Sequence, residues 1–267
     1  MYICKICNNE GMVKDKNGLP ILCECIKRKR LITLYKKIGL PLRFLDINID
    51  QYSIKQDAHG KDMGKKDETK KTVVKNVISN FIDFLPSIIE GNAFIFEKDG
   101  NSFSSFTLTL SGGKDSGKSM LAACIAKGAL KHHIRPYYLE WSEIINACYD
   151  YYSDASVKND TKIRKYERII SIVEKVDLLI IDNLSKAYES NSEDKLTSNV
   201  RRQIDSIFSV RSKTSLPIVI TTDQNFNELV SDNKYGPVLL SILEDSIKLD
   251  LPTLGESKSN VDMKKIN

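Results

Sequence analysis

The sequence lacks a long hydrophobic run. No uninterrupted apolar stretch approaches the roughly 20 residues that a helix needs to cross a bilayer. The N-terminus, Met-Tyr-Ile-Cys-Lys, has no charged stretch followed by an apolar core, so we expect no secretory signal. We therefore expect no membrane partner, a cytoplasmic location, and cysteines that are reduced thiols or metal ligands rather than disulfides.

Histidine is rare in the sequence, and arginine is absent from its C-terminal part. The chain has three histidines. His59 lies in a polar stretch, and His132 and His133 lie at the predicted end of a helix, so we assign none of them to a metal. Arginine is absent after Arg211. Any functional arginine must therefore lie at or before Arg211.

The composition is ordinary for a globular protein, with 41% hydrophobic and 28% charged residues. A chain of 267 residues has room for one large domain and one small one. The net charge of +5 is unevenly distributed. Residues 1–37 carry nine lysines and arginines against three acidic residues, and the remainder sums to about −1. The basic N-terminal segment suits nucleic acid or an acidic protein surface, and a solvated face kept charged for solubility is the alternative.

Three regions follow one another along the chain, without internal repeats. We expect a small cysteine-containing domain over residues 1–50, a linker over 51–72, and a large domain over 73–267. The linker assignment depends on residues 55–72, which contain almost nothing that could enter a core. Within the first region, apolar residues at helical spacing predict a basic helix that Gly39 and Pro41 end; they are Leu31, Leu34, Tyr35 and Ile38.

The third region opens with a predicted helix from Val73 that Pro86 ends or kinks. Strand-like and helix-like segments then alternate, which indicates the α/β class, with a parallel sheet covered by helices on both faces. The predicted strands are 103–110, 135–139, 177–181, 217–221 and 247–251. The predicted helices are 118–131, 142–151, 161–175, 194–212 and 236–243.

The strongest motif lies between a predicted strand and a predicted helix. It fits GxxxxGK[ST], the pattern of a phosphate-binding loop, in which backbone N–H groups and a helix N-terminus surround phosphate oxygens. Lys118 would neutralise the β and γ phosphates of ATP, and the Ser119 hydroxyl would ligate Mg²⁺. The expected nucleotide-binding residues are Gly112, Gly113, Lys114, Asp115, Ser116, Gly117, Lys118, Ser119 and Met120.

A second half of this site follows at the expected distance. An apolar strand ends in Asp182, which would hold Mg²⁺. Asn183 follows where ATPases of the AAA+ class usually carry the acidic residue that polarises the attacking water, and an amide cannot accept that proton. Either hydrolysis is slow or another carboxylate, such as Glu189, supplies the base. A further buried strand ends in Thr222 and Asp223, the position of a sensor of the γ-phosphate, so the expected catalytic set is Lys118, Asp182, Asn183 and Asp223.

Two pairs of cysteines lie in the first region, spaced C-x2-C and C-x-C around a loop that contains Gly11 and Gly18. Four soft ligands in two close pairs suit tetrahedral Zn²⁺, which would hold together a segment that is too short for a core of its own. Buried or redox-active thiols are the alternative. The four expected ligands are Cys4, Cys7, Cys23 and Cys25, whereas Cys124 and Cys148 lie on predicted helices and are expected to pack in the core.

Tyrosines near a helix with lysines and arginines offer a further candidate. They could stack on nucleic-acid bases, but packing of a helix end on the sheet explains them equally and is the interpretation we favour. They are Tyr149, Tyr151 and Tyr152.

Together these motifs resemble the helicase loaders DnaC and DnaI, their phage counterparts and the related transposition ATPase IstB. The resemblance covers nearly the whole chain: the cysteine head, residues 38–44 leading to Asp50-Gln51-Tyr52, the phosphate loop, the strand ending in Asp182, and residues 207–211 and 217–229. It implies an AAA+ fold with a small zinc-binding domain that grips a replicative helicase. It also implies ATP-bound subunits that associate with one another and engage single-stranded DNA.

The sequence departs from this family at one further position. Family members usually carry a Ser-Arg pair after the sensor strand, whose arginine acts on a neighbouring subunit's ATP, and the corresponding stretch here is Leu240-Ser241-Ile242. Other candidates for that arginine are Arg201, Arg202 and Arg211. We therefore expect an ATP-dependent helicase loader, with a transposition ATPase, or a nucleic-acid-binding adaptor that uses ATP as a switch without hydrolysis, as alternatives.

Overall fold

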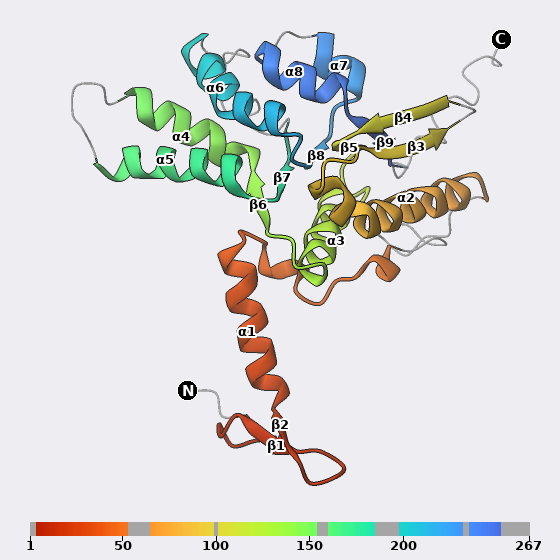
Figure 1. Ribbon diagram of the computed structural model, residues 1–267, viewed down its shortest axis with the longest axis vertical. Helices are drawn as coiled ribbons and strands as arrows, with labels where there is room; N and C mark the ends of the chain where they lie inside the picture. The colour runs from red at the N-terminus through yellow and green to blue at the C-terminus, as the bar shows by residue number, and fades with distance from the viewer. Residues whose placement is uncertain are drawn as a thin grey trace, which may run out of the picture. The chain divides into compact units, whose positions relative to one another are not determined.

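The computed structural model describes residues 4–52, 65–98, 101–153, 160–184, 198–231 and 235–251. The chain divides into two compact units between Asp46 and Ile47 (Figure 1). In chain order the helices and strands are β1 (Met12–Lys14), β2 (Pro20–Leu22), α1 (Glu24–Lys37), η1 (Leu42–Phe44), η2 (Ile49–Gln51), α2 (Lys65–Ile89), β3 (Phe94–Lys98), β4 (Asn101–Ser105), β5 (Thr107–Ser111), α3 (Lys118–Lys131), β6 (Pro136–Glu140), α4 (Trp141–Ser153), α5 (Asp160–Lys175), β7 (Leu178–Asp182), α6 (Ser198–Thr214), β8 (Ile218–Thr222), α7 (Phe226–Ser231), α8 (Pro237–Glu244) and β9 (Ile247–Asp250).

The N-terminal unit consists of the antiparallel hairpin β1–β2, the helix α1 and the short helix η1. As predicted, α1 ends just before Gly39, whose φ of +73° is a conformation that glycine adopts at little cost. Tyr35 and Ile38 are buried, whereas Leu31 and Leu34 are each 37% exposed. Half of the apolar set that predicted this helix therefore faces solvent.

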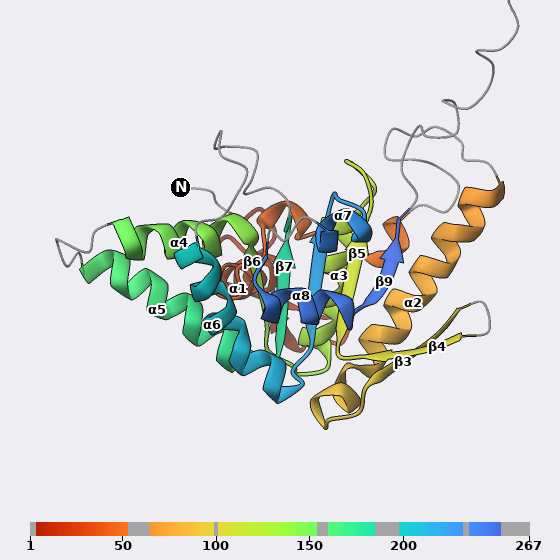
Figure 2. The same ribbon diagram turned by 90° about the horizontal axis from the view of Figure 1, so that it is seen from above.

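The C-terminal unit is built on a five-stranded parallel sheet with the order β6-β7-β8-β5-β9. Helices cover both faces, as expected from the alternating segments: α3 packs on one face, and α4, α5, α6 and α8 form a large apolar core on the other (Figure 2). Because β8 lies between β5 and β7, the three strands that carry the predicted site lie side by side. In parallel strands their carboxyl ends meet at one edge, where open α/β sheets bind ligands.

Several predicted boundaries need correction. The stretch 103–110 is not one strand: the exposed β4 pairs with β3, and the fully buried β5 joins the main sheet. The two strands part at Phe106, where Ser105 Oγ accepts a hydrogen bond from the Thr107 N–H. The first four residues of the predicted helix 194–212 lie outside the described residues.

Helix α2 is longer than predicted at both ends. It begins at Lys65, so residues 65–72 of the expected linker are helical, while residues 53–64 lie outside the described part of the chain. It also continues through Pro86 to Ile89. Leu85 and Ile88, on either side of the proline, are buried, and their burial outweighs the loss of one backbone hydrogen bond.

By length and composition alone, the Thr69–Ile89 part of α2 could cross a membrane. Packing within the unit accounts for its apolar character. Phe81 is fully buried and meets the Phe94 ring edge-on at 5.3 Å between centroids. Gly128 of α3 leaves the space that Ile82 fills, since an added Cβ would lie 2.4 Å from the Ile82 side chain. We therefore interpret α2 as a core helix of the C-terminal unit.

Candidate nucleotide site and cysteine cluster

The phosphate loop, residues 112–119, connects β5 to α3 as the motif predicts. Gly117 precedes α3 with a φ of +92°, and Gly112 has a φ of +152°; side chains rarely adopt either conformation. At Gly117 an added Cβ would also lie 2.9 Å from the Tyr52 ring, and at Gly112 it would lie 3.1 Å from the Leu251 carbonyl oxygen. The two glycines are therefore required by both conformation and space.

The Lys118 side chain is held inside this loop and is 5% exposed. Its ammonium group donates to the carbonyl oxygens of Gly112 and Gly113, at 2.6 and 2.7 Å, and lies 2.7 Å from Asp223 Oδ1. The positive charge expected to face phosphates thus lies at the carboxyl edge of the sheet, between the loop and the end of β8.

The two expected Mg²⁺ ligands are in direct contact. Ser119 Oγ donates to Asp182 Oδ1 at 2.9 Å, and Asp182 is fully buried at the end of β7. Thr221 of β8 donates a second hydrogen bond to the same carboxylate. These bonds orient the carboxylate next to the first turn of α3, a donor set of oxygens that fits Mg²⁺.

Asn183 follows Asp182 with a φ of +58°, in the left-handed region that asparagine tolerates better than most residues. Its backbone N–H donates to Thr221 Oγ1 at 2.9 Å, and its amide lies 3.3 Å from Asp182 Oδ2. The strand therefore turns sharply at this residue. Glu189, the other carboxylate considered as a base, lies outside the described residues.

A pocket of about 330 Å³ brings most of these residues together. It is lined by Lys114, Asp115, Gly117, Lys118, Ser119, Met120, Asn183 and Asp223. Asp182 is not a lining residue, but it contacts the lining residue Ser119, and Thr222 is buried at the end of β8. The arrangement can hold a phosphate chain against the loop, with a divalent cation beside Ser119 and Asp182.

Arg211 is not available as an arginine that acts on a neighbouring subunit. It is 1% exposed, and its guanidinium donates to the carbonyl oxygens of four residues, which are Val173, Val176, Asp177 and Pro217. Burial lowers the pKa of Arg211 to about 9, so the group stays protonated at neutral pH. Arg202, exposed on the same helix, and the partly exposed Arg201 remain as candidates.

Tyr52 is a site residue that motif analysis missed, although it belongs to the segment 50–52 on which the resemblance partly rests. Its ring is buried against Gly117, and Lys71 Nζ lies 5.1 Å from the ring centroid. Asp50, two residues earlier, pairs with Lys75 of α2 at 2.8 Å. These contacts hold residues 50–52 against the phosphate loop at Gly117.

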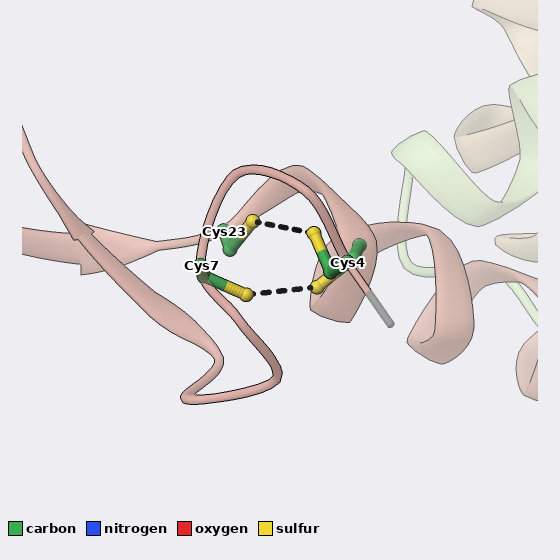
Figure 3. Close-up of side chains that lie close together, drawn as sticks. Cys4, Cys7 and Cys23 are labelled. Atoms are coloured by element: carbon green, nitrogen blue, oxygen red, sulfur yellow. Dashed lines mark hydrogen bonds between the residues drawn. The ribbon is translucent and has the colours of Figure 1, made fainter. Parts of the chain in front are cut away.

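The expected zinc ligands converge in the N-terminal unit. The Sγ atoms of Cys4, Cys7, Cys23 and Cys25 all lie within 4.8 Å of one another, and Figure 3 shows the sulfur atoms of the labelled residues facing the same point. Cys4 and Cys23 are separated by 3.9 Å, and Cys7 and Cys25 by 3.5 Å. Tetrahedral zinc with Zn–S bonds of about 2.3 Å separates its sulfurs by about 3.8 Å, so the cluster has the dimensions to hold a metal.

The backbone around this cluster favours a thiolate at one position. Hydrogen bonds from the backbone N–H groups of Cys7 and Ile6 lower the pKa of Cys4 to about 6. The two cysteines outside the cluster have the opposite shift in pKa. Cys124 and Cys148 are buried on α3 and α4, and burial raises their pKa values to about 11 and about 12, as expected of packing residues.

Two of the tyrosines near the end of α4 pack within the unit, but one of them meets a neighbouring helix rather than the sheet and stays 42% exposed. Tyr151 stacks on Tyr166 of α5 at 4.4 Å between centroids, and Tyr149 packs against the core. The Tyr152 side chain lies outside the described residues. Figure 1 shows α4 and α5 running side by side as an antiparallel pair.

Comparison with known proteins supports the fold. No protein-family model and no curated protein sequence matches the chain. Among solved structures, the chain is similar to the DnaC helicase loader, with 20% identity and a TM-score of 0.52 over 79% of this chain and 100% of that chain. It is also similar to DnaI, with 16% identity and a TM-score of 0.46 over 80% and 92% of the two chains.

A third similar structure is AMPPCP-bound DnaA from Aquifex aeolicus, with 14% identity and a TM-score of 0.48 over 76% of this chain. The match covers 51% of the DnaA chain, so this chain spans about half of its length. The likeness to DnaC shows that the C-terminal unit has the AAA+ fold, as the sequence predicted.

Proposed function

We propose that the chain is an ATP-dependent helicase loader of the DnaC and DnaI type, which delivers a replicative helicase to single-stranded DNA in the cytoplasm. The observation that carries the proposal is the contact between the phosphate loop and the end of β7, in which Ser119 bonds Asp182, within a fold similar to that of a helicase loader. The cysteine head preceding this unit supports the same family. Fold alone does not fix function, so the site is the stronger support.

The ligand of the C-terminal unit would be Mg²⁺–ATP. The loop N–H groups and Lys118 would bind the phosphates, and Ser119 and Asp182 would hold Mg²⁺. The cation supplies positive charge beside the phosphates. The chain's own contribution is a buried lysine and a carboxylate already oriented by Thr221 and Ser119.

The N-terminal unit would bind zinc through its four cysteines and contact the helicase. Zinc would supply the stability that so small a unit lacks. Several of its apolar side chains are exposed, and exposed apolar residues beside a basic helix suit a protein partner with an apolar and acidic surface. They are Ile6, Met12, Leu19 and Ile21, at 71%, 44%, 60% and 42%.

A second candidate function is an adaptor that binds ATP as a switch and hydrolyses it slowly. Two observations favour it: Asn183 has an amide where a base is expected, and Arg211 is buried. In this case ATP-bound subunits would still associate and bind single-stranded DNA. Arg201 or Arg202 would be the remaining candidates for contact with a neighbour's nucleotide.

A loading experiment tests the main proposal. The full chain, a hexameric replicative helicase and circular single-stranded DNA are mixed with Mg²⁺–ATP, and helicase retained on the circles is measured after gel filtration. We expect retention with the wild type, none with Lys118→Ala although that variant still binds helicase, and no helicase binding by Cys7→Ser. Failure of the wild type to bind any replicative helicase tested would contradict the loader proposal and leave the adaptor.

A further inference from the structure

We propose that Asp223 determines nucleotide preference at this site: its carboxylate takes the place on Lys118 that the terminal phosphate of ATP would occupy, and so favours ADP over ATP. The inference rests on the proposed nucleotide-binding function. It assigns a specificity-determining role to a residue that the sequence marks only as a possible sensor. Its basis is the 2.7 Å ion pair between Lys118 Nζ and Asp223 Oδ1.

The ammonium group of Lys118 has no donor left for an additional ligand. A lysine has three N–H donors, and Lys118 has three close acceptors, the carbonyl oxygens of Gly112 and Gly113 and the Asp223 carboxylate. Ser116 Oγ is a fourth, more distant neighbour at 3.3 Å. A phosphate oxygen can therefore bind Lys118 only by displacing one of these acceptors.

Asp223 is the acceptor most easily displaced by phosphate, and the one most like it. The two carbonyls belong to the loop itself, whereas the Asp223 side chain is 53% exposed and lines the pocket. Like a phosphate, it presents an anionic oxygen to the lysine. A half-exposed carboxylate is thus paired with a buried ammonium group at the carboxyl edge of the sheet.

The charge of Asp223 then acts differently on the two nucleotides. The loop N–H groups bind the phosphates nearest the loop, and the third phosphate of ATP extends toward the carboxyl ends of β7 and β8, where Asp182 and Asp223 lie. Two like charges a few ångströms apart repel each other strongly at a partly buried site. ADP, which is one phosphate shorter, leaves room for the Lys118–Asp223 pair.

The pocket offers a control for simple loss of negative charge. Asp115 also lines it, is exposed in the loop, and makes no ion pair with Lys118 within the described residues. Asp115→Asn removes the same charge as Asp223→Asn from a different place. Asp223→Glu keeps the charge at the original place.

The test is a fluorescence competition titration of ADP and of a non-hydrolysable ATP analogue, at fixed Mg²⁺, on the full-length wild type and these three variants. We expect Asp223→Asn to shift the ratio of the two dissociation constants at least about fivefold toward ATP. For Asp115→Asn and Asp223→Glu the ratio of the two dissociation constants should stay within about twofold of the wild-type ratio, whether or not the separate affinities change.

An unchanged ratio in Asp223→Asn, or an equal shift in Asp115→Asn, would overturn this inference while leaving the nucleotide site intact. If the wild type and Asp223→Asn both bind neither nucleotide, the proposed function itself fails. Circular dichroism melting of each variant verifies that the fold is retained.

Discussion

Arg211 Nη1 donates to the Val173 carbonyl oxygen at 2.8 Å, and this bond ties helix α6 to the end of α5 inside the core. The same guanidinium also reaches the Pro217 carbonyl at the start of β8. One buried side chain thereby satisfies backbone acceptors in two loops that lead into β7 and β8. We infer that Arg211 stabilises the two strands that end at the nucleotide site.

Replacing Arg211 by lysine is therefore predicted to lower stability rather than to remove one catalytic step. A lysine keeps the charge but cannot reach four carbonyls in a fork, and each buried acceptor that loses its only partner costs about 1 to 3 kcal/mol. The Pro217 carbonyl keeps a hydrogen bond from the Leu179 N–H. We expect Arg211→Lys to lower the free energy of unfolding in urea by roughly 2 to 4 kcal/mol. Arg202→Lys, at an exposed position of the same helix, should change it by less than about 0.5 kcal/mol. A stable Arg211→Lys protein would contradict the structural role.

The contact between Gly117 and Tyr52 gives a second prediction. Gly117→Ala imposes a side chain on a φ of +92° and drives its Cβ to 2.9 Å from the Tyr52 ring. Gly91→Ala serves as its control, because Gly91 has a similar φ of +97° but no atom within 4 Å of an added Cβ. Backbone strain of about 1 to 2 kcal/mol is common to both.

We expect both variants to melt at lower temperature, and only Gly117→Ala to lose nucleotide affinity, by about tenfold or more. Equal nucleotide affinity in the two variants would show that the Tyr52 contact does not position the phosphate loop.

Metal content provides a third prediction. The four converging sulfurs lead us to expect about one zinc per chain in protein purified without chelator. Cys7→Ser should lose this zinc, whereas Cys124→Ser, which changes a buried cysteine outside the cluster, should retain it. Elemental analysis of the three proteins decides the matter. An absence of zinc from the wild-type protein would contradict the zinc site and indicate a cluster of free thiols.

Hydrolysis is the subject of a fourth prediction, at Asn183. We expect slow wild-type ATP turnover, because the amide can orient a water but cannot take its proton. The φ of +58° makes aspartate a better test than glutamate, because aspartate tolerates the left-handed region. Asn183→Asp should raise turnover above wild type, and the gain should stay well below the roughly 10²- to 10⁴-fold that general-base catalysis typically contributes. Brisk wild-type turnover in a steady-state assay would defeat the switch interpretation.

The fold could be predicted from sequence largely because short strands alternate with helices in the main sheet: β5, β6, β7 and β8 are each followed along the chain by a helix, and β9 is the last described element. The sequence predicts the position of the phosphate loop correctly, because the motif specifies the end of β5 and the start of α3. By contrast, the boundary at Phe106 was invisible, because β4 and β5 form one continuous strand-like stretch. For helix α2 the sequence predicts too early an end, because Pro86 breaks a helix unless neighbouring side chains are buried.

The site was only partly predictable for a different reason. Lys118, Ser119 and Asp182 belong to motifs, but the pairing of Lys118 with Asp223 depends on β8 lying beside β5, which strand order along the chain does not reveal. The burial of Arg211 likewise depends on contacts among α5, α6 and β8. Tyr52 carries no motif of its own, and its role is evident only from the space beside Gly117.

Binding of Mg²⁺–ATP at the phosphate loop is the central property proposed for the C-terminal unit, and one titration tests it directly. A fluorescent ATP analogue is added, with Mg²⁺, to the wild type, to Lys118→Ala and to Lys114→Ala, which removes a lysine exposed in the same pocket. We expect tight binding by the wild type and a loss of about tenfold or more in Lys118→Ala, because a charged hydrogen bond of about 1.5 to 3 kcal/mol is removed. Lys114→Ala should lose less. Equal affinity of Lys118→Ala and wild type would contradict the assignment of this loop as the ATP site.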